Sequence, residues 1–239
     1  MSVQSDVLAL VPARGGSKSI PKKNLASLAG RPLLDYGVFA ALACGRCNRI
    51  VCSTDDNEIA VRAGTLGIEV DWRPAALATD DAAVADVARE FLQRQATMPE
   101  IVVLVQPTSP FLLSEHIAKL LDLMHAQPEA KSGQTIASIP HNYHAWNQRL
   151  VENDHVRFHF AAERRHAHNK QRKPQLFCFG NLVAARSQAL LAGGDFFVEP
   201  SVGYLIDWPY NLDVDGPNDL LLAGAVMQAG LVRLGHITS

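Results

Sequence analysis

Short apolar runs alternate with segments of helical spacing along the first 140 residues of the chain. The runs predict five strands, at 7–11, 49–53, 69–72, 101–105 and 134–139. The segments between them predict four helices, at 32–42, 55–66, 80–95 and 114–124. Strands that alternate with helices of about 10–15 residues form parallel sheets covered by helices, so we expect a mostly parallel α/β fold. Because ligands bind beyond the carboxyl ends of such strands, the loops there are the places to search for function.

Several helix starts carry residues that are typical of N-caps. Asp55 or Asp56 is expected to cap the second helix. Asp80 or Asp81 is expected to cap the third, and Ser114 the fourth. These residues sharpen the predicted boundaries, since a cap satisfies backbone N–H groups that have no partner within the helix.

The composition changes at about residue 141. The stretch 141–173 has a net charge of +4, from seven Lys and Arg and three acids, and it shows no clear apolar period. It also contains six of the nine histidines, which are His141, His144, His155, His159, His166 and His168. A stretch this long is unusual for a loop inside a compact domain. We therefore expect a core of 1–140 and 175–239, with 141–174 as an insertion that serves as a dimerisation arm; a disordered, solvated insertion is the alternative.

The end of the chain returns to the pattern of the core. Here the sequence predicts a late strand at 204–207, a short strand end at 212–214, and a helix at 218–229 that Pro217 opens.

The overall composition is that of a globular chain. The chain has 239 residues, of which 48% are hydrophobic and 19% are charged, and its formal net charge is −2. This balance does not favour general binding to nucleic acid. The apolar runs are far shorter than the ~18 residues needed to span a bilayer, and the polar start lacks the basic region of a secretory signal. We expect a cytoplasmic protein that does not associate with membranes.

Cys44 and Cys47 form a C-x-x-C pair, which by itself could indicate zinc or redox chemistry. A structural zinc site needs four ligands, and no second C-x-x-C or H-x(3–5)-H pair stands at a suitable distance. Because the pair lies at the predicted end of a helix, we interpret the two cysteines as ordinary small residues.

The most specific signal is the loop after the first strand, residues 12–24, which holds four cations within ten residues. Gly15 and Gly16 allow close approach of the backbone and could leave amide N–H groups free for an anion. Arg14 can bind phosphate oxygens with two parallel hydrogen bonds, and the lysines add mobile charges, so the loop suits a triphosphate. It fits neither G-x-G-x-x-G nor G-x-x-x-x-G-K-[ST], which argues against a dinucleotide dehydrogenase or a P-loop protein. A solvated basic turn is the alternative.

Asp213 and Asp215 form a second candidate site. In an extended strand, residues two apart point to the same face, so the two carboxylates would face one region. Mg²⁺ takes such oxygen ligands and bridges phosphates. In the alternative interpretation these are surface acids, with Asp215 as the cap of the helix that follows Gly216 and Pro217.

Two further loops could contribute polar contacts. Gln106, Thr108 and Ser109 follow the fourth strand in a turn stiffened by prolines, although a rigid turn that caps the next helix explains them equally well. Arg73 stands at a strand end, where it is either a solvated charge or a contact for a nucleobase or a phosphate.

Five stretches, in the same order along the chain, resemble the acylneuraminate cytidylyltransferases, which activate nine-carbon α-keto acid sugars as CMP derivatives. These stretches are 11–24, 53–56, 73–80, 106–110 and 212–220. The resemblance implies a Rossmann-like α/β fold, CTP and an anionic nine-carbon sugar as substrates, Mg²⁺ as cofactor, and a homodimer with an exchanged arm.

The resemblance also implies roles for individual residues. Nucleotide binding would fall to Arg14, Gly15, Gly16, Ser17, Lys18, Lys23, Asn24, Arg73 and Ala82. The sugar would meet Gln106, Thr108 and Ser109, and the metal would be held by Asp213 and Asp215. Catalysis would depend on Arg14, Lys23 and Asp215.

The chain departs from the family pattern on the sugar side. Phe111, Leu112 and Leu113 stand where the family often has an arginine, and Val84 stands where it usually has a hydroxyl residue. The stretch 178–182 reads C-F-G-N-L in place of the family's R-P-N-G-A, so an arginine expected to contact the sugar is absent.

The leading hypothesis is that CTP and a 3-deoxy-2-ulosonic acid, of the sialic, legionaminic or pseudaminic type, give the CMP-sugar and pyrophosphate. One alternative is a CTP-binding homologue that has lost transfer activity. Others are a nucleotidyltransferase for 3-deoxy-octulosonate, and a glycosyltransferase that uses Asp213-x-Asp215 to bind a sugar nucleotide.

Overall fold

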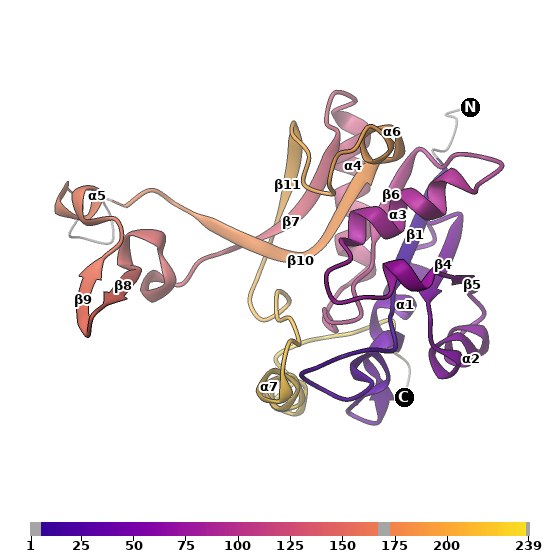
Figure 1. Ribbon diagram of the computed structural model, residues 1–239, viewed down its shortest axis with the longest axis horizontal. Coiled ribbons are helices and arrows are strands. Elements are labelled where there is room, and N and C mark those ends of the chain that lie inside the picture. Colours follow the sequence, from indigo (N-terminus) through magenta and orange to yellow (C-terminus); the bar gives the residue numbers. More distant parts are fainter. Residues whose placement is uncertain (1–5, 167–172, 238–239) are drawn as a thin grey trace.

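A seven-stranded sheet forms the centre of the computed structural model, which describes residues 6–166 and 173–237 (Figure 1). The strands lie in the order β11-β7-β10-β6-β1-β4-β5. Their bounds are β1 Val7–Pro12, β4 Arg49–Thr54, β5 Glu69–Trp72, β6 Ile101–Leu104, β7 Ser132–Ser138, β10 Phe177–Arg186 and β11 Ser201–Ile206. Only β10 runs antiparallel to its neighbours within this described sheet. The mostly parallel α/β fold predicted from the sequence is confirmed.

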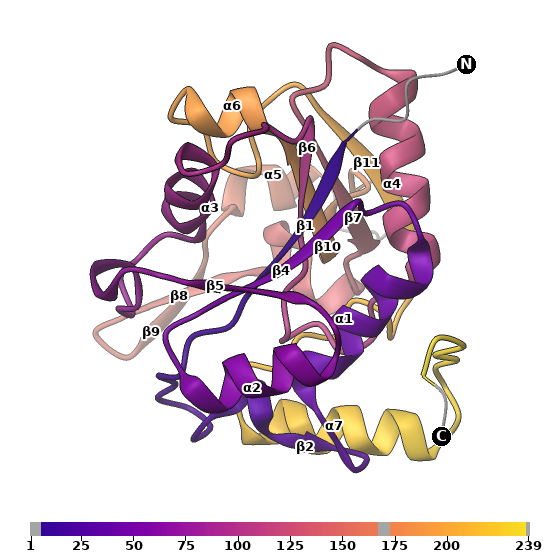
Figure 2. The ribbon, with the colours of Figure 1, turned by 90° about the vertical axis from the view of Figure 1, so that its right-hand side faces the viewer.

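Helices cover both faces of the sheet (Figure 2). One face is covered by α1 (Leu33–Cys44), α2 (Asn57–Thr65) and α4 (Ser114–Ala126), and the other by α3 (Val84–Gln93) and α6 (Ser187–Leu191). Side chains along β1 alternate between the two cores, because successive strand residues point to opposite faces. Val7, Ala9 and Val11 pack with the first set of helices, and Leu8 and Leu10 with the second.

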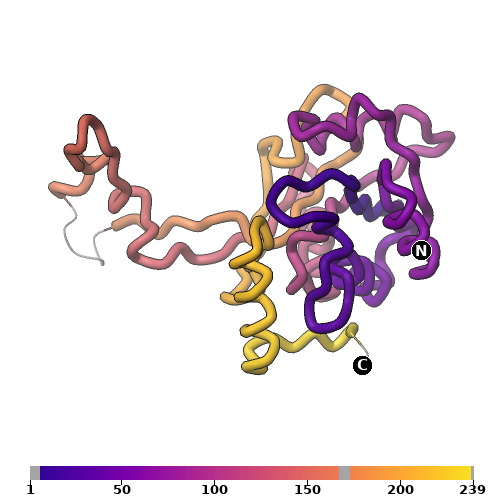
Figure 3. The backbone as a smooth tube through the Cα atoms, turned by 60° about the horizontal axis from the view of Figure 1, so that its bottom comes forward, coloured from indigo at the N-terminus to yellow at the C-terminus, as the bar shows by residue number. Residues whose placement is uncertain are grey.

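The helix α7 (Pro217–Gln228) packs beside the loop that follows β1 (Figure 3). Between that loop and α1 lie a 3₁₀ turn, η1 (Lys23–Leu25), and a small ribbon of β2 (Ser27–Leu28) and β3 (Arg31–Pro32). Leu28, Tyr36 and Val226 join these parts in a third core, and the Tyr36 hydroxyl donates to the Leu28 carbonyl at 2.5 Å. Both ends of the cation-rich loop are therefore anchored in packed structure.

The helix caps agree with the sequence in one case and differ in two. Asp56 caps α2, where its Oδ1 accepts from two backbone N–H groups at 2.8 and 3.0 Å. The prediction that Asp80 or Asp81 caps the next helix was wrong, because α3 begins only after Ala83. The loop before it first forms a 3₁₀ turn, η2 (Ala75–Leu77), which moves the helix start along the chain.

The second differing cap lies at the start of α4, and a predicted strand before α7 is also corrected. Ser114 is the first residue of α4 and not its cap, a position that Leu113 takes. Residues 212–214 form no strand: the Val214 N–H donates to the Thr108 carbonyl at 2.8 Å, and no ladder continues from it. Helix α7 begins at Pro217 as predicted.

The insertion protrudes from the core on two strands, β7 and β10 (Figure 1). It consists of η3 (His141–Tyr143), η4 (Ala145–Asn147), β8 (Arg149–Glu152), β9 (His155–Phe158) and α5 (Ala161–His166). Its contacts are local, since Arg149 and Arg164 lie over the ring of Phe158 at 4.8 and 4.1 Å from the centroid. His168, one of the six histidines noted above, falls outside the described residues.

The cysteine pair lies where the first helix ends. Cys44 is the last residue of α1, and Cys47 packs against the core, where burial raises its thiol pKa to about 12. A thiol with so high a pKa is a poor nucleophile and a poor metal ligand at neutral pH. Over residues 6–166 and 173–237, no helix combines the length and apolar character needed to cross a bilayer.

Candidate active site

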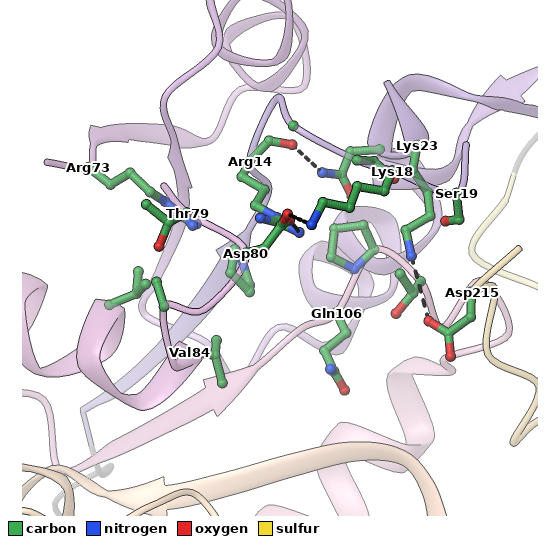
Figure 4. Close-up of a pocket in the computed structure, with 18 residues that line it drawn as sticks. Arg14, Lys18, Ser19, Lys23, Arg73, Thr79, Asp80, Val84, Gln106 and Asp215 are labelled. Atoms are coloured by element: carbon green, nitrogen blue, oxygen red, sulfur yellow. Dashed lines mark hydrogen bonds and ion pairs between the residues drawn. The ribbon is translucent and has the colours of Figure 1, made fainter. Parts of the chain in front are cut away.

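A pocket of about 450 Å³ with several charged lining residues opens beyond the carboxyl ends of β1 and β6 (Figure 4). The chain continues from β1 to β4 and β5 on one side and returns through β6 on the other, so the strand order reverses between β1 and β6. Open α/β sheets bind ligands at such a point because the loops after the two strands diverge there. The lining residues are Pro12, Arg14, Gly16, Ser17, Lys18, Ser19, Lys23, Asn24, Arg73, Thr79, Asp80, Ala82, Val84, Val87, Gln106, Pro107, Thr108 and Asp215.

Most of the residues chosen from the sequence meet in this pocket. Those that line it are Arg14, Gly16, Ser17, Lys18, Lys23, Asn24, Arg73, Ala82, Gln106, Thr108 and Asp215. Gly15, Ser109 and Asp213 do not line it. Each of the three is a near neighbour in the sequence of a residue that does line it.

Gly15 ties the cation-rich loop to the start of α2. Its N–H donates to Asp55 Oδ1 at 2.9 Å, so this amide is not free for an anion as the sequence suggested. A Cβ at Gly15 would lie 2.7 Å from Oδ2 of Asp56, which only glycine avoids. Gly16 differs, since a Cβ there would meet nothing within 4 Å. Behind the loop, the Asn24 side-chain amide donates to the Arg14 carbonyl at 2.8 Å.

Asp80 is a charged site residue that sequence reasoning missed, and Ser19, Thr79 and Val87 also line the pocket without having been assigned to it. The Asp80 carboxylate pairs with Arg14 Nη2 and with Lys18 Nζ, each at 2.5 Å (Figure 4). Hydrogen bonds from these two cations lower the pKa of the Asp80 carboxyl below its usual value. The available signal was an acid in the loop after a parallel strand, but its proximity to a helix pattern made it resemble a cap.

Lys23 and Asp215 form a second charged group at the other end of the pocket. Lys23 Nζ lies 3.1 Å from the Val214 carbonyl and 3.6 Å from Asp215 Oδ1. The interpretation of Asp215 as a helix cap was wrong: Gly216 is the N-cap, and Oδ2 of Asp219 accepts the Asp215 and Gly216 N–H groups at 3.1 and 2.8 Å. The Asp215 carboxylate is therefore not required to start α7, and 83% of its side chain is exposed.

Asp213 stands beside this group, behind the turn that follows β6. Its Oδ1 lies 3.4 Å from the hydroxyl of Ser109, which is almost fully buried. Loss of solvation raises the pKa of Asp213, and the charge of Asp215 adds to the rise, while hydrogen bonds from Thr108 and Ser109 oppose it. The two carboxylates thus lie close enough to repel each other even though no strand places them on one face. A bound divalent cation would relieve that repulsion.

Arg73 supplies a buried guanidinium on the opposite wall. Its Nη2 donates to the Ser53 carbonyl at 2.7 Å, and its Nε is buried without a partner. Burial lowers its pKa, against the nearby charges of Asp55 and other acids. A buried donor without a partner is costly, so this group favours a ligand that accepts from it.

The remaining wall of the pocket is apolar or neutral. Val84 and Val87 line it from α3, and Gln106 and Thr108 from the loop after β6. Phe111 and Leu112 are fully buried in the cores, so the turn that carries them brings no cation to the site. Cys178 lies outside the pocket lining, with its thiol 3.5 Å from the Ala137 carbonyl.

A family model described as "Cytidylyltransferase" matches residues 8–171, which is more than half of the chain. The chain belongs to this cytidylyltransferase family. The matched stretch includes the cation-rich loop, Arg73, Asp80 and Gln106, and it ends before Asp213 and Asp215.

Curated relatives of this chain include proteins named as a CMP-sugar synthase and as a cytidylyltransferase. The chain is 37% identical over 137 residues to the CMP-N,N'-diacetyllegionaminic acid synthase of Legionella pneumophila, covering 56% of this chain and 57% of that protein. It is 28% identical over 226 residues to the N-acylneuraminate cytidylyltransferase of Escherichia coli, covering 95% of this chain and 53% of that protein. The chain therefore spans about half the length of these relatives.

Solved structures support the fold of this chain. The CMP:2-keto-3-deoxy-manno-octonic acid synthetase complexed with CTP superposes with a TM-score of 0.73 at 17% identity, covering 95% of this chain and 100% of that chain. The 4-diphosphocytidyl-2C-methyl-D-erythritol synthase of Anaerococcus prevotii superposes with a TM-score of 0.63 at 14% identity, covering 94% and 99%. The two superpositions establish a shared architecture, and at identities this low they establish the fold alone.

Proposed function

We propose that this cytidylyltransferase couples CTP to a 3-deoxy-2-ulosonic acid of the sialic, legionaminic or pseudaminic type, with the CMP-sugar and pyrophosphate as products. The observation that carries the proposal is the convergence of Arg14, Lys18 and Lys23 on one pocket at the point where the strand order reverses. The relatives named for sialic and legionaminic acids support the choice of sugar.

The chain's own groups would act mainly by positioning and by neutralising charge. Arg14, Lys18 and Lys23 would bind the triphosphate, and the buried Arg73 would donate to the nucleotide. The sugar would approach from the side of Gln106. Its anomeric hydroxyl would attack the α-phosphorus in line and release its proton to water, forming the new oxygen–phosphorus bond as pyrophosphate leaves with the electrons of the broken bond. Lys23 would stabilise negative charge that develops during attack.

The two carboxylates at the end of the pocket fit a magnesium ion. Asp215 lines the pocket and Asp213 lies next to it, and Mg²⁺ commonly binds one or two carboxylates together with phosphate oxygens of the substrate. In the described residues, no group of three or more His, Cys, Asp or Glu side chains could hold a metal alone, so phosphate oxygens of the nucleotide would have to complete the site. Once bound, Mg²⁺ would supply positive charge at the reacting phosphates.

We also propose that the protein acts as a homodimer in the cytoplasm. The arm exposes the side chains of Tyr143, Val151 and Val156, which are 71%, 69% and 64% accessible. Apolar side chains gathered on a projecting segment favour contact with a second copy. The four cysteines are all free, as is usual in a reducing compartment.

A pyrophosphate-release screen tests the proposed reaction. Each of the four nucleoside triphosphates is combined with sialic, legionaminic, pseudaminic or 3-deoxy-octulosonic acid in the presence of Mg²⁺, with sugar-free reactions as controls. We expect release only with CTP and a nine-carbon acid. Release with the eight-carbon acid alone would favour the 3-deoxy-octulosonate alternative. Binding of CTP without release across the whole panel would favour a homologue that has lost transfer activity.

A further inference from the structure

Two of the pocket's cations already hold an anion that belongs to the chain itself. Asp80 Oδ1 lies 2.5 Å from Arg14 Nη2, and its Oδ2 lies 2.5 Å from Lys18 Nζ (Figure 4). The cations come from the loop after β1, and the acid comes from the loop after β5. Each carboxylate oxygen thus takes one cation, which is the arrangement that a phosphate group would need from the same two side chains.

The carboxylate has no structural duty that would keep it there. In the described part of the chain, the partners of the Asp80 side chain are those two cations, and α3 begins after Ala83 without using it as a cap. Its side chain is 36% exposed, and that of Lys18 is 85% exposed. Asp80 can therefore leave the pair without exposing a core or breaking a helix end.

We propose that Asp80 is an intramolecular competitor for the polyphosphate subsite: it occupies Arg14 and Lys18 in the free protein, gives them up to an entering polyphosphate, and recovers them when pyrophosphate leaves. The inference rests on the proposed function, because it takes the pocket of Arg14 and Lys18 to be the site for the triphosphate.

The competition has a consequence that can be measured for both substrate and product. Every polyphosphate that uses the two cations must first break the same two ion pairs, so the affinities for CTP and for pyrophosphate fall by a common factor. Exposed ion pairs are individually weak, and two of them together correspond to roughly a two- to thirtyfold change in affinity. Weaker product binding also favours release of pyrophosphate after each turnover.

Calorimetric titration of the full chain tests the proposal, with pyrophosphate and CTP as probes, each in EDTA and in Mg²⁺. The test variant is Asp80→Asn, which keeps the size of the side chain and removes its charge. The matched control is Asp81→Asn, which removes the same charge from the neighbouring exposed residue and leaves both ion pairs in place. We expect Asp80→Asn to bind both probes roughly two- to thirtyfold more tightly than the natural protein, with or without Mg²⁺, and Asp81→Asn to change much less.

The other outcomes distinguish this proposal from the proposed function. Equal effects of Asp80→Asn and Asp81→Asn would overturn the competitor, because the gain would then come from net charge alone. Weaker binding by Asp80→Asn in Mg²⁺ only would also overturn it, and would make Asp80 a ligand of the nucleotide-bound cation. If neither the natural protein nor Asp80→Asn binds CTP or pyrophosphate in any condition, the pocket does not bind polyphosphates, and the proposed function fails as well.

Discussion

The ion pairs of the pocket join residues far apart in the sequence, whereas those of the arm join near neighbours. In the pocket, the cations of one loop meet acids from distant parts of the chain: Arg14 pairs with Asp80, and Lys23 with Asp215. In the arm, the partners are near neighbours, as in the pair of Arg157 with Glu152 across the β8–β9 hairpin at 2.7 Å. The pocket therefore exists only when the loops after β1, β5 and β6 have been brought together, whereas the arm is organised by contacts within itself.

This difference indicates that the two regions serve separate purposes. Charges that depend on long-range folding stand in fixed positions, as a site for chemistry requires. An arm with local pairs and exposed apolar side chains can project from the core without disturbing that site. Changes in the pocket should accordingly alter ligand binding and turnover, and changes on the arm should alter association with a second copy.

The largest effect is expected from Asp215→Asn. If the Asp215 carboxylate holds Mg²⁺ on the triphosphate, turnover should fall by about two orders of magnitude or more, and the Mg²⁺ requirement should move to higher concentration. The fold should be unaffected, because Gly216 and Asp219 start α7. Asp219→Asn is the matched control, which should lower the unfolding temperature and leave the Mg²⁺ dependence unchanged. Normal turnover and metal dependence in Asp215→Asn would remove this residue from the metal site.

A pH effect is expected at His116, where α4 packs against β10. His116 Nδ1 accepts from the Leu113 N–H at 3.3 Å, and the Asn181 side-chain amide lies 3.0 Å away. Burial lowers the pKa of His116 to about 4. The unfolded chain binds the proton more tightly, so the contribution of neutral His116 to stability is complete above about pH 6.5 and is lost as the pH falls toward 4, by about 3 kcal/mol.

Urea unfolding at pH values between 4 and 7 measures this contribution. The non-titrating variant His116→Gln should show a smaller decrease in unfolding free energy across that interval than the natural protein. Identical pH profiles for the two proteins would show that His116 does not titrate as its buried position requires.

In the pocket, Arg14→Ala should weaken CTP binding at least about tenfold, because it removes a permanently charged donor. The same change releases Asp80 from one ion pair, so the loss in affinity measures Arg14 together with that release. Calorimetric titration with CTP checks the expectation, and Arg157→Ala on the arm is the matched control. Unchanged CTP affinity in Arg14→Ala would show that the nucleotide does not use this loop.

A smaller effect separates the two glycines of the same loop. Gly15→Ala places a methyl group against the side chain of Asp56, so it should destabilise the fold by about 1–3 kcal/mol and weaken CTP binding. Gly16→Ala places the methyl group in open space and should change the unfolding temperature little. Thermal unfolding of the two variants gives the comparison. Equal unfolding temperatures would mean that the loop is not pinned against α2.

The smallest effect on the stability and ligand binding of the core is expected from substitutions in the arm. Val151 and Val156 stand opposite each other in the hairpin, so Val151→Glu combined with Val156→Lys keeps a favourable cross-strand pair while removing two exposed apolar side chains. We expect light scattering to show a monomer, with CTP affinity unchanged and the unfolding free energy within about 0.5 kcal/mol of the natural protein. A dimer of unchanged strength would exclude this hairpin from the interface.

The sequence was sufficient for most of the pocket and for the parallel strands of the sheet, but it missed the antiparallel strand β10. Apolar runs gave the parallel strands because a strand covered on both faces must be apolar throughout, and the loops after those strands are brought together by topology. It was insufficient where a polar side chain has several possible partners. Asp80 has the residue type and the sequence position of a helix cap, and only the folded chain brings Arg14 and Lys18 to it. Likewise, Asp215 precedes a helix start that Asp219 in fact stabilises.

Phosphorus NMR of a reaction mixture tests the central claim most directly. The protein is incubated with CTP, Mg²⁺ and a nine-carbon 3-deoxy-2-ulosonic acid, and the phosphorus signals are followed with time. We predict that the three signals of CTP decline together while one phosphodiester signal of a CMP-sugar and one pyrophosphate signal grow in equal molar amounts. Persistence of the CTP signals, or their conversion to CDP and inorganic phosphate, would contradict the proposed transfer.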